Sequence, residues 1–82
     1  MDTQTLKTFV AVCKTRSFSR TADRLFVTQS TVTKRIAQLE EELSRKLFVR
    51  DKRSVRLTEE GGILLTYAER MIELEQASIE EM

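Results

Sequence analysis

The 82-residue chain is 40% apolar, which suits one small domain with a single hydrophobic core and argues against wholesale disorder. It has no histidine, one cysteine and two adjacent glycines. It therefore lacks a Cys/His zinc site, a Ser-His-Asp or Cys-His catalytic system, an internal disulfide and a glycine-rich phosphate loop.

The charge is divided along the chain. Residues 1–58 hold thirteen cations and six acids, a formal charge of +7, whereas residues 59–82 hold one cation and seven acids, a formal charge of −6. This division favours a polyanionic partner for the basic segment and a separate role for the acidic one. We expect no enzymatic activity, no metal and no cofactor. The longest apolar run, residues 9–13, is too short to cross a bilayer, so we expect a cytoplasmic protein without a membrane partner.

Two helices are predicted in the first 25 residues. Asp2 or Thr3 is expected to cap the first, which should end near Arg16. Its apolar residues recur at helical spacing on one face, namely Leu6, Phe9, Val10 and Cys13. We expect Ser19 to cap a short second helix that runs to about Leu25.

A third helix, capped by Thr28, follows after a connection of only two residues, which predicts a helix-turn-helix. Its core-facing stripe is Val32, Ile36, Leu39 and Leu43. The opposite face begins with small polar residues and Lys34. Three acids, Glu40 to Glu42, then form a block that phosphate would repel, so only the first half of the helix is suited to a nucleic-acid groove. A plain amphipathic surface helix is the alternative.

The segment from Leu47 to Thr58 loses helical periodicity and predicts a short hairpin. Residues 48–50 are its first strand, and the alternation around Val55 and Leu57 is its second. Five cations lie in the hairpin and its approach: Arg45, Lys46, Arg50, Lys52 and Arg53. A basic hairpin beside a helix-turn-helix is a wing that reaches phosphates or a minor groove. A solvated charged turn is the alternative.

Thr58 is expected to cap a final helix. Gly61 and Gly62 each cost about 1 kcal/mol relative to alanine inside a helix, which suggests close approach to another backbone. The apolar band on this helix is too wide for one small monomer to cover, so we expect a partner helix from a second copy. The predicted interface residues are Ile63, Leu64, Tyr67, Ala68, Met71 and Leu74.

With these residues in view, the chain resembles the N-terminal DNA-binding domain of LysR-type transcriptional regulators. The stretches LKTFVAV, SFSRTADRLFVTQSTVTKRI, LEEEL and LTEEG carry the resemblance in order and spacing, and it covers nearly the whole chain. It implies a mainly α fold, with a winged helix-turn-helix over residues 1–58 and a linker helix over residues 59–82. It also implies a homodimer with antiparallel linker helices, and a small-molecule effector bound by a C-terminal domain beyond this chain. Ser44 stands where the family usually has glycine, so the end of the third helix is expected to differ.

The expected activity is sequence-specific binding of double-stranded DNA by a transcriptional regulator. The resemblance places four residues against the bases: Gln29, Ser30, Thr33 and Lys34. Phosphate and wing contacts are expected from Ser19, Arg20, Thr28, Thr31, Arg50, Lys52 and Arg53. A winged-helix module that binds protein and does not read DNA is the alternative function.

Overall fold

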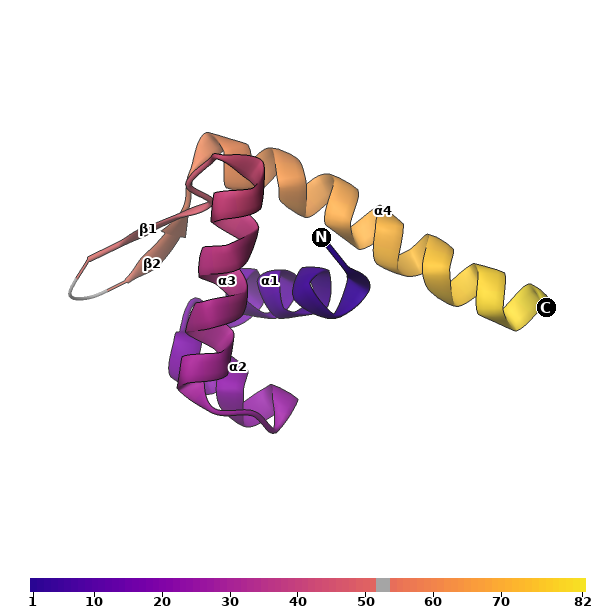
Figure 1. Cartoon of the computed structure of the whole chain (residues 1–82), viewed down its shortest axis with the longest axis horizontal. Coiled ribbons are helices and arrows are strands. Elements are labelled where there is room, and N and C mark those ends of the chain that lie inside the picture. The colour runs from indigo at the N-terminus through magenta and orange to yellow at the C-terminus, as the bar shows by residue number, and fades with distance from the viewer. Residues whose placement is uncertain (52–53) are drawn as a thin grey trace.

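The computed structural model describes residues 1–51 and 54–82 and contains four helices and one two-stranded sheet in these ranges. The elements are α1 (Thr3–Thr15), α2 (Phe18–Leu25), α3 (Gln29–Leu43), β1 (Phe48–Arg50), β2 (Val55–Leu57) and α4 (Glu59–Glu81). Figure 1 shows that the hairpin projects from one side of the body formed by α1, α2 and α3, while α4 extends from the other side. The predicted fold, mainly α with a winged helix-turn-helix and a long final helix, is confirmed.

Side-chain caps set the starts of the helices. Three of them are the predicted ones, Asp2, Thr28 and Thr58. The prediction of Ser19 as the cap of α2 is wrong, because Ser17 has the extended backbone and its hydroxyl accepts the Arg20 N–H at 3.1 Å. Ser19 lies inside the first turn. Two serines two residues apart both have the chemistry of a cap, and only the backbone geometry distinguishes them.

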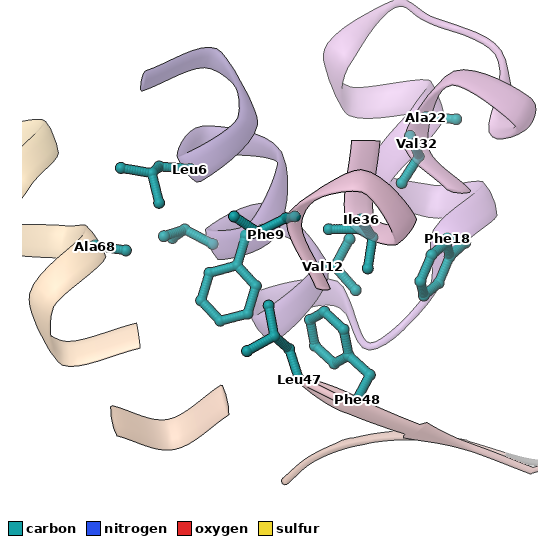
Figure 2. Close-up of a cluster of buried hydrophobic side chains, with 12 residues drawn as sticks. Leu6, Phe9, Val12, Phe18, Ala22, Val32, Ile36, Leu47, Phe48 and Ala68 are labelled. Atoms are coloured by element: carbon teal, nitrogen blue, oxygen red, sulfur yellow. The ribbon is translucent and has the colours of Figure 1, made fainter. Parts of the chain in front are cut away.

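The core lies where α1, α2 and α3 meet the base of the hairpin (Figure 2). The largest fully buried side chains are Phe9, Ile36, Leu39, Leu47, Val12 and Val32. Phe48 at the start of β1 packs on two rings, with centroids 5.4 Å from Phe9 and 6.2 Å from Phe18. These aromatic contacts join the hairpin to the helical body, and offset or edge-on pairs of this kind contribute about 0.5–1.5 kcal/mol each beyond area burial.

The hairpin is antiparallel, and Phe48 pairs with Leu57, Val49 with Arg56 and Arg50 with Val55. Its base is fastened to α4, because the Thr58 N–H donates to the Leu47 carbonyl at 3.0 Å. The base of the hairpin is therefore held by the core and by the start of α4.

The first half of α4 packs against α1. Ala68 is completely buried there (Figure 2), and Leu64, Leu65 and Ile72 are partly buried against the same core. Leu65 and Ile72 were not among the apolar residues singled out on this helix from the sequence. Gly61 passes close to another backbone, as expected, but Gly62 has no neighbour within 4 Å of where a Cβ would lie. Within the described residues, no helix is both long and apolar enough to cross a membrane.

Candidate nucleic-acid interface

The first half of α3 presents an open polar face. Gln29, Ser30 and Lys34 are exposed, and Thr33 is half-buried. Among the residues that the structure describes, none provides a hydrogen-bond partner for these four side chains. Their donors and acceptors therefore face solvent and are free to bind a ligand.

Two threonines fix the start of this face. The Thr28 hydroxyl accepts the Thr31 N–H at 3.1 Å, and the two hydroxyl oxygens are 2.9 Å apart. This closes the first turn of α3 and satisfies one of its free N–H groups. Both threonines, predicted as phosphate contacts, thus also hold the local geometry of the helix.

A concave surface of about 450 Å³ lies between the start of α2, the start of α3 and the hairpin. We call it the junction hollow. It is lined by Arg16, Ser19, Arg20, Gln29 and Arg50, among others. The structure thus brings four of the predicted residues into one surface, Ser19 and Arg20 of α2, Gln29 of α3 and Arg50 of the wing, whereas the other predicted residues of α3 do not line it. Arg16 was not among the predicted site residues; it lies here because it ends α1 in a left-handed conformation, with φ 55°.

The two wing residues Lys52 and Arg53 lie outside the described residues. Arg50, at the end of β1, is described, and its guanidinium carbon is 3.8 Å from the centroid of the Phe18 ring. The predicted wing is therefore a basic hairpin whose first cation is stacked against α2.

The three acids of the predicted block differ in exposure: Glu41 and Glu42 are exposed, whereas Glu40 is partly buried. Glu40 turns inward and its carboxylate accepts the N–H groups of Leu47 at 2.7 Å and Phe48 at 3.3 Å. Glu42 binds the N-terminal ammonium group at 2.8 Å. Glu40 therefore acts as a brace between α3 and the hairpin.

Arg35 is a cation of α3 that does not belong to the open face. Its guanidinium donates to the Thr8 hydroxyl at 3.2 Å, and Thr8 is fully buried in α1. Thr8 donates in turn to the Gln4 carbonyl at 3.0 Å. The position of Arg35 between two helices indicates a structural role.

The Cys13 thiol is half-buried, as expected for a small apolar residue. Burial, followed by the nearby Glu69 carboxylate, raises its pKa to about 12. The thiol therefore stays protonated near neutral pH and is a poor nucleophile.

A second candidate surface lies on α4. Ile63, Tyr67, Met71 and Leu74 are exposed, with Leu74 at 69%. Ala68 was predicted in the same interface, but it is fully buried against the chain's own core and has no accessible surface to offer. Leu64 is also packed against that core and is only partly accessible.

Three helices, with a tight turn between α2 and α3, and a basic hairpin define a winged helix-turn-helix protein. Residues 3–62 match the family described as bacterial regulatory helix-turn-helix protein, lysR family. The chain belongs to this family, as the resemblance predicted.

Known relatives agree with this assignment. The chain is 48% identical over its full 82 residues to the HTH-type transcriptional regulator HdfR of Salmonella newport and Salmonella typhimurium, and it spans 30% of the length of these relatives. It is similar to the crystal structure of a CbnR_DBD–DNA complex, with a TM-score of 0.96 and 33% identity over 99% of this chain and 93% of that one. A BenM_DBD/catB site 1 DNA complex gives a TM-score of 0.94 and 33% identity over 99% and 91% of the respective chains.

Proposed function

We propose that this chain is the DNA-binding part of a transcriptional regulator and binds double-stranded DNA in a sequence-specific manner. The observation that carries the proposal is the open polar face of α3 beside a cationic hollow and a basic hairpin. The similar CbnR and BenM domains, solved as DNA complexes, support it. The proposal includes no enzymatic activity, and it implies a cytoplasmic location, where bacterial DNA lies.

In this proposal the first half of α3 enters the major groove. Gln29 has the geometry to pair bidentately with adenine N6 and N7, and Lys34 donates to guanine O6 and N7. Ser30 and Thr33 donate or accept at neighbouring base edges, and Thr33 also offers a methyl group to thymine. Each good base contact contributes about 1–3 kcal/mol of discrimination.

Contacts to the DNA backbone set the register of the protein but carry no sequence information. We assign them to residues that surround the open face: Ser19, Arg20, Thr28, Thr31 and Arg50. Lys52 and Arg53 are included in this set on the basis of the sequence. The formal charge of +7 on residues 1–58, to which these cations contribute, steers the protein toward duplex DNA.

We further propose a homodimer through α4. Support comes from the exposed apolar side chains of Ile63, Tyr67, Met71 and Leu74, which nothing within this chain covers among the described residues. The proposed division into a DNA-binding body (residues 1–58) and a dimerisation helix (59–82) separates two roles. It does not separate two folding units, because the first half of α4 packs on the core of the body. Effector binding would belong to the part of the longer relatives that this chain does not span.

Fluorescence anisotropy with a random-sequence duplex in dilute buffer tests DNA binding. We expect the logarithm of the association constant to fall linearly with the logarithm of salt concentration, with a slope of about −0.9 per phosphate contact. Selection of bound duplexes from a random pool then identifies the preferred site. If the protein attracts duplex no better than a neutral protein of its size, the protein-interaction module becomes the better description.

Sedimentation equilibrium tests the dimer. Leu74→Glu places a charge in the proposed interface and should shift the chain toward monomer. Phe26→Glu is the matched control, because Phe26 is also an exposed apolar residue, at 94%, but lies in the turn between α2 and α3. Equal effects of the two changes, or a wild-type monomer at all concentrations, would contradict this interface.

A further inference from the structure

The contact between Phe18 and Arg50 joins two residues that are 32 positions apart. The guanidinium carbon of Arg50 is 3.8 Å from the ring centroid. The Phe18 ring itself is fixed by the core, since its side chain is 6% exposed and it packs edge-on against Phe48 at 6.2 Å (Figure 2). A rigid ring thus supports a cation at the end of a short strand.

This contact lies at the wall of the junction hollow. Arg16, Arg20 and Arg50 all line the hollow, together with one carboxylate, that of Asp51. The Asp51 carboxylate accepts the Ser54 N–H at 2.8 Å. Three guanidinium groups around one concave surface suit a phosphate diester as a ligand.

The kind of contact matters for what Arg50 can still bind. A cation over an aromatic face is held by the π electrons of the ring, so none of the five N–H donors of the guanidinium is consumed by the ring. The side chain is therefore partly ordered before DNA arrives, while its donors remain available. Binding then costs less side-chain entropy than it would for a freely rotating arginine.

We infer that Phe18 is a positioning residue for DNA binding: its ring holds the Arg50 guanidinium in the junction hollow, where it contacts a phosphate of the DNA backbone. This inference rests on the proposed function. It assigns to a residue of the hydrophobic core a second role, which is to orient a wing cation toward the ligand.

A double-mutant cycle on DNA affinity tests the inference. Arg50→Ala should weaken binding and lower the salt slope by about 0.9, the value for one phosphate contact. Phe18→Leu should weaken binding about two- to tenfold while Arg50 is present, which corresponds to the cost of ordering one long side chain. In the Arg50→Ala background, Phe18→Leu should have no further effect. Equal losses in both backgrounds would show that Phe18 acts only through stability and would overturn the inference.

Two measurements do not depend on how well Phe18→Leu folds. Arg50→Lys keeps the charge but loses the planar group, so it should keep the wild-type salt slope and bind about two- to tenfold more weakly. In the wild-type protein without DNA, NMR should show Arg50 side-chain protons shifted upfield by the ring current of Phe18. Wild-type affinity for Arg50→Lys, or unshifted Arg50 protons, would contradict the role of Phe18. Absence of DNA binding by the wild type would instead overturn the proposed function.

Discussion

The carboxylate of Glu40 accepts the backbone N–H of Leu47 at 2.7 Å and so ties the last turns of α3 to the entry of the hairpin. The same oxygen accepts the Phe48 N–H at 3.3 Å. One side chain therefore sets where the wing starts relative to the helix proposed to read the bases. These two hydrogen bonds fix the position of the hairpin base relative to α3.

Glu40→Ala should lower the free energy of unfolding by about 1–3 kcal/mol, because it leaves the N–H groups of two buried residues without their acceptor. Glu41→Ala is the control: Glu41 is exposed, and its removal should change stability by less than about 0.5 kcal/mol. Urea denaturation measures both. Equal stabilities of the two variants would contradict the bracing role of Glu40.

The adjacent glycines of α4 should respond in opposite directions to alanine. At Gly61 a Cβ would lie 2.2 Å from the Leu47 carbonyl oxygen, a backbone atom that already accepts the Thr58 N–H. We expect Gly61→Ala to destabilise the protein by about 1–3 kcal/mol. Gly62→Ala meets nothing within 4 Å and should stabilise the helix by about 0.5–1 kcal/mol. Thermal melting of the two variants checks the sign of each effect, and a stabilising Gly61→Ala would rule out the close approach.

Ser44 ends α3 with φ 52° and ψ 39°, the left-handed conformation that glycine adopts most easily. The expectation that serine would change how this helix ends is wrong in geometry, since the cap is an ordinary left-handed one. Serine instead affects stability. A residue with a Cβ costs about 1–2 kcal/mol in the left-handed conformation. Glycine avoids this cost, but part of the gain is offset because glycine has more conformational freedom in the unfolded chain. Ser44→Gly should therefore raise stability by about 0.5–1 kcal/mol in chemical denaturation. Ser44→Ala keeps the strain and should be nearly neutral, and a matching gain for alanine would refute the conformational explanation.

Lys34→Ala should reduce the preference for a selected DNA site over random duplex, because the proposed contact of Lys34 is to a base edge. A loss of about 1–3 kcal/mol corresponds to roughly a 5- to 150-fold smaller specificity ratio. Lys14→Ala removes an exposed cation of α1 and should leave the ratio unchanged even if overall affinity falls. Competition binding with specific and random duplexes measures the ratio, and an unchanged value for Lys34→Ala would remove it from the base-reading set.

Several parts of the fold were accessible to reasoning from residues close together in the chain. The caps Thr28 and Thr58, the apolar stripe of α3 and the hairpin strands all depend on neighbours within a few positions. Capping joins a side chain to an N–H three residues later, and helical or strand periodicity repeats within one turn or two residues. The exposure of Gln29, Ser30 and Lys34 follows from the same periodicity, whereas their contact with DNA remains a prediction.

Other features required the packed structure, because they join segments whose separation in sequence carries no local signal. The brace from Glu40 to Leu47, the identity of Leu47 as the residue that Gly61 approaches, and the stacking of Arg50 on Phe18 all depend on where helices and hairpin cross. Ala68 shows the limit most directly: its place in an apolar band suggested a surface for a second copy, but α1 covers it completely. Periodicity identifies which residues share a helix face, and only the meeting of distant elements decides what that face touches.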